Sequence, residues 1–377
     1  VVVISKDGTI GEIVNIEGLY IALPSKPTKI INDRFQEKHQ KWTRELIPDE
    51  LLNFDKYVTD DDDYDKKLKE VHKANIEYIK SDINKIINGD WFMCDGKVMY
   101  ITGYNYFFLQ HYKLSDFRRY PDFREPQRDY FLWIEACIAD NRCLGSLYLK
   151  NRRSFFSVCS ASIVLCSSIR KKNGDYPIVS KTEKDAGKLF TKHIVKPFNT
   201  LSKHLQPQRV GEVSPKKELH FIAPKRKMTA NNSGNSTSDG LDTIITYLAS
   251  VIDAYDGSQP TISLNDEVGK MKGCNINDYW EQSHKMCHSV GGLTTGKALV
   301  GSTANPPNQG GANYLKFYTD SKLKTRGEIG ETGTGLYAIF IKADLMQMYF
   351  YDEYGYAVVG NPDAPIKNEV GNYISMG

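Results

Sequence analysis

The sequence predicts an α/β fold in which a mainly parallel sheet is covered by helices on both faces. From residue 124 onward, short apolar segments suited to strands alternate with segments suited to helices, which is the pattern of a parallel sheet. One apolar segment, 261–264, runs directly into Asn265-Asp266-Glu267. Acidic side chains are therefore expected at the carboxyl edge of that sheet, where ligands collect.

The composition is that of an ordinary globular protein. Of 377 residues, 40% are hydrophobic and 25% are charged, which excludes collagen-like, fully disordered and small disulfide-framework classes. The length allows two or three domains of about 150 residues each. The 49 Lys and Arg residues against 46 Asp and Glu leave a formal net charge of +3, so any contact with nucleic acid needs a local basic patch.

Nothing in the sequence predicts membrane insertion or secretion. No uncharged apolar run approaches the ~20 residues of a membrane helix, and the apolar start at residues 1–4 is interrupted by Lys6 and Asp7. The seven cysteines are an odd number without a CxxC pair, which favours reduced, buried thiols. We expect a soluble chain in the cytoplasm with no membrane partner.

Three regions are expected along the chain. Residues 1–85 form an N-terminal extension, whose apolar residues over 66–87 recur at helical spacing. Residues 86–345 form the main α/β domain, and residues 346–377 form a C-terminal tail. The main domain begins with an aromatic segment at 89–114, which is expected in the core, and its Asp95-Gly96 pair predicts a hairpin turn.

The remaining elements of the main domain follow in order. Helices are expected over 126–139, where Pro126 suits a first turn, and over 158–169, 184–198 and 276–289. Strands are expected over 147–149, 176–179, 219–222, 262–264, 298–300 and 337–341. The stretch 231–239 holds no apolar residue and is expected to be a flexible loop.

The acidic pair carries the first chemical signal. A short strand that ends in Asp-Glu is how a Walker B site is built. Asp266 would hold Mg²⁺, and Glu267 would orient and polarise the attacking water. The pattern is only moderately specific, because a strand followed by an acid also occurs by chance in α/β proteins.

A basic loop between strand 147–149 and helix 158–169 is the second signal. A helix N-terminus offers free N–H groups and a favourable dipole to an anion. The residues expected to bind a nucleotide here are Lys150, Arg152, Arg153, Ser154, Phe155, Phe156 and Ser157, and the Ser157 hydroxyl is also a candidate Mg²⁺ ligand. The loop departs from the G-x-x-x-x-G-K-[ST] rule, since it has no glycine and Phe156 stands where the rule wants lysine. A basic surface loop that caps a helix is the alternative interpretation.

Two further motifs complete an ordered set. The strand 298–300 is followed by Gly301-Ser302-Thr303, and such a strand beside the Walker B strand can sense the γ-phosphate state and pass it on. Gln127, about 25 residues ahead of the basic loop, is suited to contact an adenine. The glutamine, the basic loop, the acidic pair and the Ser-Thr strand occur in the order of a RecA-like P-loop ATPase, which predicts ATP and Mg²⁺ as ligands.

One stretch is a candidate for contact with a phosphate backbone. Residues 216–227 hold five basic side chains against the single acid Glu218: Lys216, Lys217, Lys225, Arg226 and Lys227. A solvated surface strand and loop accounts for this charge equally well.

With these motifs in place, the chain resembles the large terminase subunit of tailed bacteriophages, most closely that of the crAss-like phages. The likeness rests on residues 89–109, 128–154 and 264–270 with 300–303, and it spans roughly residues 85–345. It implies a motor that hydrolyses ATP to push double-stranded DNA through a portal protein into a procapsid. It also implies a small terminase subunit as partner, a homo-oligomeric ring on the portal, and the cytoplasm of the bacterial host as the location.

The resemblance also implies roles for single residues. Lys150 would be the cation at the start of a deviant Walker A loop, with Arg153 as the alternative. Asp266 would be the Mg²⁺ ligand and Glu267 the catalytic carboxylate, Ser302 and Thr303 the coupling motif, and Gln127 the adenine contact. The arginine that completes a neighbouring site in the ring would be one of Arg118, Arg119, Arg152, Arg170 and Arg326.

The sequence departs from that family in two places. Relatives usually keep a glycine where Phe155 stands, and a benzyl side chain is expected to obstruct close approach of phosphate. An assembly module that binds nucleotide or DNA with little turnover is therefore the alternative function. Full large terminases continue into an RNase H-like nuclease, whereas Asp352, Glu353 and Asp363 are too few and too close to the end for its two-metal site, so no nuclease activity is expected.

Overall fold

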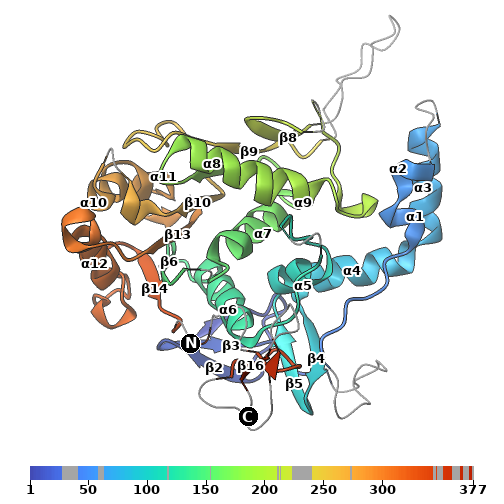
Figure 1. Cartoon of the computed structure of the whole chain (residues 1–377), viewed down its shortest axis with the longest axis horizontal. Coiled ribbons are helices and arrows are strands. Elements are labelled where there is room, and N and C mark those ends of the chain that lie inside the picture. Colours follow the sequence, from blue (N-terminus) through green and yellow to red (C-terminus); the bar gives the residue numbers. More distant parts are fainter. Residues whose placement is uncertain are drawn as a thin grey trace, which may run out of the picture.

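The computed structural model describes residues 1–27, 41–57, 63–116, 119–152, 154–209, 212, 214–222, 240–271, 274–342, 345, 351–358, 366–367 and 373–375. At its centre lies a seven-stranded sheet with the spatial order β14-β6-β13-β10-β7-β9-β8 (Figure 1). These strands are β6 (Gly145–Lys150), β7 (Asp175–Val179), β8 (Glu218–Phe221), β9 (Thr243–Tyr247), β10 (Ile262–Asp266), β13 (Lys297–Thr303) and β14 (Leu336–Ile339).

The sheet is mainly parallel, as predicted. All neighbouring strands from β14 to β9 run parallel, and only the edge strand β8 runs antiparallel to β9. Parallel strands need long crossover connections, and most of these connections contain helices here, whereas the one from β9 to β10 is made of turns. The prediction of an α/β fold with a mainly parallel sheet is confirmed.

Helices and turns cover both faces of the sheet. Neighbouring residues of each strand point to opposite faces, so each strand contributes side chains to both layers. Tyr148 and Leu299 belong to an apolar cluster that includes α6 (Glu125–Ala139) and α7 (Phe156–Ser168). Leu147 and Val300 belong to a second cluster, which includes residues of α10 (Ile276–Tyr279) and α12 (Gly311–Asp320). The strands are thus buried on both faces, which explains their continuous apolar sequences.

The aromatic segment 89–114 forms the predicted hairpin and, in addition, a buried helix that was not predicted. Strands β4 (Asp90–Cys94) and β5 (Lys97–Ile101) pair antiparallel around a two-residue turn. Asp95 and Gly96 have φ angles of 49° and 71°, the left-handed values that such a turn requires. The side chains of α5 (Gly103–Gln110) are buried, so the aromatics belong to the core rather than to an exposed stacking surface.

Three predicted helices are interrupted in the structure. The segment 66–87 forms α3 (Tyr64–Ala74) and α4 (Ile76–Asn88), which part at Asn75, where the side-chain Nδ2 donates to the Val71 carbonyl at 2.9 Å and so competes with the helical bonding. The segment 184–198 is α8 (Glu183–Phe190), a π-helical turn η2 (Thr191–Val195) and α9 (Lys196–Phe198). The segment 276–289 likewise continues from α10 through a π-helical turn η5 (Trp280–His284) to α11 (Lys285–Cys287).

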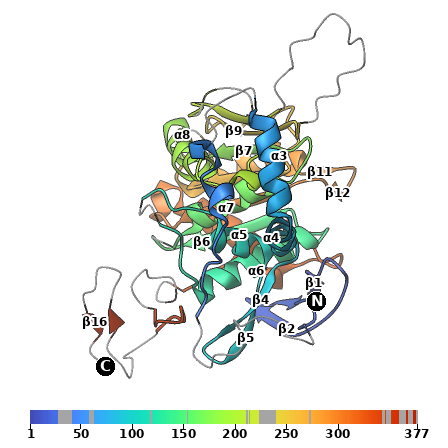
Figure 2. The ribbon, with the colours of Figure 1, turned by 90° about the vertical axis from the view of Figure 1, so that its right-hand side faces the viewer.

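Several elements were not predicted. Besides β9 and α12, these include an N-terminal sheet of β1 (Val2–Val3), β2 (Ile13–Ile16) and β3 (Leu19–Ala22), which packs against α6. Figure 2 shows this sheet at the same end of the molecule as β4 and β5. Lys6 Nζ also lies 2.5 Å from Glu135 Oε1 of α6. Parts of the predicted extension 1–85 therefore share the main apolar core.

The other elements are short. They are α1 (Asp49–Leu52), α2 (Phe54–Tyr57), the 3-10 turns η3 (Lys203–Leu205), η4 (Val268–Lys270), η6 (Pro307–Gln309) and η7 (Leu323–Thr325), and the strands β11 (Ser289–Val290), β12 (Leu293–Thr294), β15 (Ile366–Lys367) and β16 (Tyr373–Ser375). The expected loop at 231–239 lies outside the described residues. Within the described part of the chain, no helix has the length and apolar character needed to cross a membrane.

The cysteines agree with the expectation of free thiols. All seven are free, and five of them are buried, whereas Cys274 and Cys287 are half-buried. Burial raises the pKa of the Cys159 and Cys166 thiols, so these two side chains behave as small apolar core residues.

Candidate active site

Three predicted motifs meet at the carboxyl edge of the central sheet. Strand β6 ends at Lys150, β10 at Asp266 and β13 at Thr303. Strand β13 lies between the other two, with Thr303 opposite Lys150 and Gly301 opposite Asp266. Residues that are more than 100 positions apart in sequence are thus neighbours, at the edge where open α/β sheets bind ligands.

Lys150 is the counterion of both acidic residues. Its Nζ lies 2.5 Å from Asp266 Oδ1 and 2.9 Å from Glu267 Oε1, and its side chain is only 7% exposed. Burial alone would lower the pKa of Lys150, but the negative charges of Asp266 and Glu267 outweigh it, and the pKa lies above its ordinary value. The lysine is therefore a buried cation that balances two carboxylates.

Glu267 is held in an unusual backbone conformation directly after β10. Its φ angle is 56°, and its N–H donates to the Gly301 carbonyl at 2.7 Å. Its Oε2 lies 2.5 Å from Lys270 Nζ and accepts a hydrogen bond of 3.4 Å from Thr303 Oγ1. A glutamate rarely adopts the left-handed region, and such strain is concentrated at functional sites.

The charge state of Glu267 follows from these contacts. Burial would raise the pKa of Glu267, but the charge of Lys150 and the hydrogen bonds from Lys270 and Lys150 keep it below its ordinary value. The carboxylate is therefore ionised at neutral pH, which a group that polarises a water requires. Lys270 was not assigned a role from the sequence, although its position three residues after Glu267 places it on the same turn.

Ser157 and Asp266 form a donor set that suits a hard cation. The Ser157 Oγ, in the first turn of α7, donates to Asp266 Oδ2 at 2.7 Å, so a hydroxyl and a carboxylate converge. The described residues contain no group of three or more His, Cys, Asp and Glu side chains that could hold a metal. The pair nevertheless fits Mg²⁺, which takes one or two protein carboxylates and completes its shell with water and phosphate oxygens.

The start of α7 fits an anion. Phe155 is the N-cap residue and provides no side-chain hydrogen bond to the helix, so the first-turn N–H groups are not capped by it. Ser154 is 3% exposed, and its hydroxyl lies near that of Tyr148 without a well-aligned hydrogen bond among the described residues. A buried hydroxyl with spare hydrogen-bonding capacity beside an uncapped helix N-terminus is an arrangement that a phosphate would satisfy.

The two phenylalanines of the loop have different surroundings. Phe156 is buried, and its ring lies so close to Gly301 that a Cβ there would meet it at 2.5 Å. Phe155 is half-buried, and the Arg124 guanidinium lies 5.1 Å from its ring centre. Arg124 also lies 4.6 Å from the ring centre of Tyr351. Phe156 therefore packs the loop against the sheet, while Phe155 packs toward the start of α6.

The other residues predicted for this site are less closely connected to it. Arg152 is exposed and forms no ion pair among the described residues, and Arg153 lies outside them. Gln127, in the first turn of α6, is 3% exposed and forms no side-chain hydrogen bond within the described chain. Thr303 contacts Glu267, whereas the Ser302 Oγ donates to the Thr303 carbonyl at 3.1 Å.

Tyr314 is a further residue of the site that the sequence did not indicate. Its hydroxyl accepts a hydrogen bond of 3.1 Å from the Ser302 N–H and donates to the Tyr148 carbonyl at 3.0 Å. It thereby ties α12 to β13 and β6 behind the cluster of charged side chains. No sequence motif marks it, because its role depends on a contact between distant segments.

The predicted backbone-binding stretch lies away from this site. Lys216 and Lys217 are exposed immediately before the edge strand β8, which is separated from β10 by β9 and β7. The residues Lys225, Arg226 and Lys227 lie outside the described part of the chain. The structure therefore does not bring Lys216 and Lys217 together with the acidic pair.

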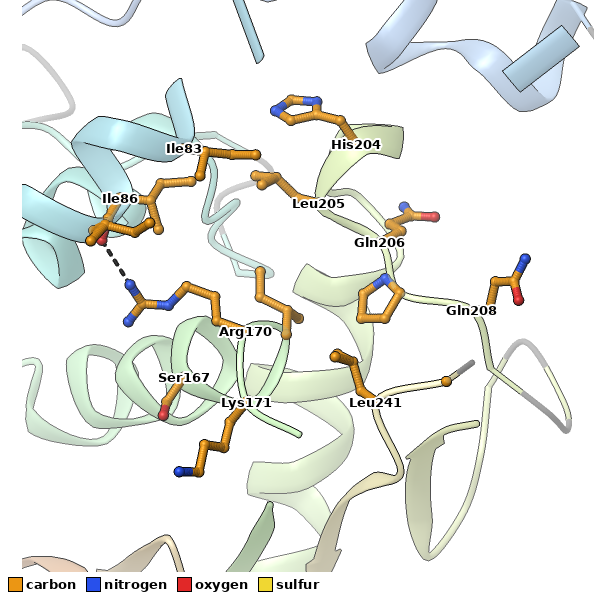
Figure 3. A pocket seen from close by; sticks show the side chains of 14 residues that line it. Ile83, Ile86, Ser167, Arg170, Lys171, His204, Leu205, Gln206, Gln208 and Leu241 are labelled. Carbon is orange, nitrogen blue, oxygen red and sulfur yellow. Dashed lines mark hydrogen bonds between the residues drawn. The ribbon is translucent and has the colours of Figure 1, made fainter. Parts of the chain in front are cut away.

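Two of the candidate ring arginines, Arg170 and Arg326, are placed apart from the site, whereas Arg152 belongs to the basic loop itself. Arg170 follows α7 at the opposite edge of the sheet, where its guanidinium donates to the Ile86 carbonyl at 2.9 Å beside a cavity of about 730 Å³ (Figure 3). Arg326 lies 4.3 Å from the ring centre of Tyr337. Arg118 lies outside the described residues. The arginine that completes a neighbouring site stays a prediction.

Comparisons with known proteins do not place the chain in a family. No protein-family model matches it, and a search of the curated proteins also finds no match. The site is therefore characterised by its own geometry, and the terminase resemblance remains a prediction.

Phe155 offers a direct test of the loop conformation. Its φ angle of 60° favours glycine, so we expect Phe155→Gly to be more stable than Phe155→Ala by about 1 kcal/mol. Both variants lose the same ring, and the comparison isolates the backbone. Thermal unfolding followed by circular dichroism measures the difference, and an alanine variant as stable as the glycine variant would contradict the loop geometry.

Proposed function

We propose that this chain is an ATP hydrolase that drives the translocation of double-stranded DNA, as the motor part of a terminase large subunit with a RecA-like core. The observation that carries the proposal is the buried cluster of Lys150, Asp266 and Glu267, joined through Ser157 to the uncapped start of α7. The basic loop follows β6, the acidic pair lies at the end of β10 and the Thr303 hydroxyl ends β13, so three strand ends of one mainly parallel sheet contribute to the site.

The order of the strands supports a RecA-like core. The strand with the Ser-Thr motif, β13, lies directly beside the acidic strand β10 and contacts it through Thr303 and Glu267. It also borders β6, which leads into the basic loop. A change at the phosphate site would therefore reach the Ser-Thr strand through direct contacts, as the coupling role requires.

The charges of the site suit a Mg²⁺–triphosphate substrate. When bound, Mg²⁺ would neutralise charge on the phosphates and on Asp266, with Ser157 as a further ligand. Lys150 would then be free to turn from Asp266 toward a phosphate oxygen, exchanging one anionic partner for another. The N–H groups at the start of α7 and the Ser154 hydroxyl would donate to the same phosphates.

Glu267 would act on the attacking water. Its carboxylate is ionised and is oriented by Lys270 and Thr303. Once Lys150 turns away, one carboxylate oxygen is available to accept a hydrogen bond from water and align it with the terminal phosphorus. The proton of that water passes toward Glu267 as the new bond to phosphorus forms and the bond to the leaving diphosphate breaks.

A second candidate function is an assembly module that binds nucleotide or DNA with little turnover. It is favoured by one observation, the side chain of Phe155 at the left-handed position that begins α7, where a glycine would leave the backbone open. In that case the contacts of Lys150 and Glu267 would stabilise the nucleotide-free conformation of the site, which would rarely change into a conformation able to hydrolyse ATP.

The macromolecular partners rest on the resemblance. We propose duplex DNA contacted through its phosphates, a portal protein, a small terminase subunit and a homo-oligomeric ring assembled on the portal. Contacts to phosphates rather than base edges would let a motor accept any sequence.

Steady-state ATP hydrolysis with Mg²⁺, measured with and without duplex DNA, tests the proposed function. We expect turnover that DNA stimulates and that falls as salt is raised, because phosphate contacts release counterions. Binding of ATP without turnover, in the presence and absence of DNA, would favour the assembly module instead.

A further inference from the structure

A second cavity lies between the N-terminal helices and the α/β core. Its volume is about 410 Å³, and its wall includes Arg44, Lys56, Lys113, Lys203, Asp55 and Tyr120. These residues come from the segment before α1, from α2, from the segments after α5 and from η3. None of them belongs to the candidate active site, so the cavity is a separate feature of the molecule.

The charged residues that line this cavity are mainly basic. Four basic side chains face a single acid, Asp55, among the described residues that line it. That acid is already paired, because Lys203 Nζ lies 3.0 Å and 3.1 Å from its two carboxylate oxygens. Burial opposes its ionisation, but the bonds from Lys203 and Tyr64 keep the pKa of Asp55 below its ordinary value. Asp55 therefore balances Lys203, and the other three cations have no acid to balance them among the described residues that line the cavity.

Those three cations are held without carboxylate partners. The side chains of Lys56 and Lys113 form no ion pair or hydrogen bond within the described part of the chain. The Arg44 guanidinium lies 3.7 Å above the ring of Tyr120, and its one hydrogen bond is a long contact of 3.5 Å to the Gln110 carbonyl. A guanidinium stacked on a ring is oriented, yet its N–H edge remains able to bind an oxyanion.

We propose that this cavity binds the phosphate group of a small phosphorylated ligand. Three uncompensated positive charges in a concave wall repel one another and focus a positive potential, which a multiply charged anion relieves. Arginine and lysine side chains are the usual phosphate ligands, and the volume lies within the range of small-molecule sites. The proposal goes beyond the ATPase function and does not depend on it.

Calorimetric titration with inorganic pyrophosphate in the absence of Mg²⁺ tests this site. Because pyrophosphate also resembles a ligand of the candidate active site, the titration uses both the parent chain and a Lys150→Met variant. We expect saturable binding that persists in Lys150→Met and weakens at least tenfold in Lys113→Met and in Lys56→Met. Lys196→Met, which alters an exposed lysine of α9 outside the cavity, serves as the matched control and is expected to bind as the parent does.

Two results would overturn the proposal. One is the absence of saturable binding in Lys150→Met at a temperature at which circular dichroism shows that variant to be folded. The other is binding that neither Lys113→Met nor Lys56→Met weakens while both variants unfold at the parent's temperature. Competition with a short DNA duplex identifies the source of the phosphate. If the duplex displaces pyrophosphate from the parent but not from Lys113→Met, the site is assigned to a phosphodiester backbone. If pyrophosphate stays bound in the presence of the duplex, the site is assigned to a free phosphorylated ligand. Failure of ATP turnover would leave all of these results unchanged.

Discussion

Replacing Glu267 with glutamine is expected to lower the rate of ATP hydrolysis at least 100-fold while ATP binding stays within about threefold of the parent. Glutamine keeps the size of the side chain and its contact with Thr303, but it cannot accept a proton from water. The loss should appear in kcat rather than in KM, because the carboxylate acts on the transition state rather than on the bound substrate. Single-turnover hydrolysis and nucleotide binding, measured on the same preparation, separate the two effects.

A matched control strengthens this experiment. Glu281 lies in the turn that follows α10, and among the described residues it forms just an exposed pair with Lys285 at 3.3 Å. Glu281→Gln makes the same chemical change outside the site and should leave kcat unchanged. Hydrolysis in Glu267→Gln at more than a tenth of the parent rate would show that Glu267 is not the group that activates water.

Replacing Lys150 with methionine is expected to act on stability and on nucleotide binding together. The substitution leaves Asp266 and Glu267 as two adjacent, largely buried carboxylates without their shared cation, which should cost about 3 kcal/mol. The same change removes the cation proposed to meet the phosphates, so ATP affinity should fall at least tenfold. Chemical denaturation and calorimetry measure the two quantities.

Lys270→Met is the control for this second prediction. Lys270 also pairs with Glu267, but it is more exposed than Lys150 and does not pair with Asp266 in the described chain. Its loss should cost less than about 1 kcal/mol and should leave ATP affinity nearly unchanged.

In addition, Lys150→Met combined with Asp266→Asn should recover part of the lost stability, because one of the uncompensated charges is removed. If Lys150→Met and Lys270→Met changed stability and ATP affinity equally, the assignment of Lys150 as the shared counterion of both acids would be contradicted.

The sequence predicted the sheet because its strands are buried on both sides. Strands such as β10 and β13 are short, mostly apolar segments that end in polar residues, and their alternation with helical segments indicates buried parallel strands. The turn at Asp95-Gly96 and the helix that begins near Pro126 were predictable for local reasons, since each depends on the backbone preferences of one or two residues.

Other parts of the fold depend on contacts that sequence patterns do not show. The N-terminal sheet gains its stability from packing against α6, and β9 from lying between β7 and β8. Asn75 divides a segment that is amphipathic throughout, because its side chain bonds to a carbonyl of the preceding turn. Tertiary contacts and local side-chain bonds override periodicity in these places.

The residues of the candidate site could be predicted from the sequence, but the contacts between them could not. Asp266 and Glu267 follow a recognisable strand, and Lys150 ends another. That one lysine pairs with both acids could not be read from the sequence, because the pairing depends on β13 lying between their strands. The left-handed conformation of Phe155 was equally hidden, since a phenylalanine gives no sign of the position that a glycine would mark.

The measurement that tests the central claim most directly is a calorimetric titration of the parent chain with ATP, with and without Mg²⁺. The structure predicts a site at which ATP binds more tightly with Mg²⁺ and more weakly in Lys150→Met, because Asp266 and Ser157 would offer their oxygens to the ion while Lys150 and the start of α7 would take the phosphates. Absence of saturable binding under both conditions, or binding whose affinity neither Mg²⁺ nor Lys150→Met changes, would contradict the assignment of this edge of the sheet as a nucleotide site.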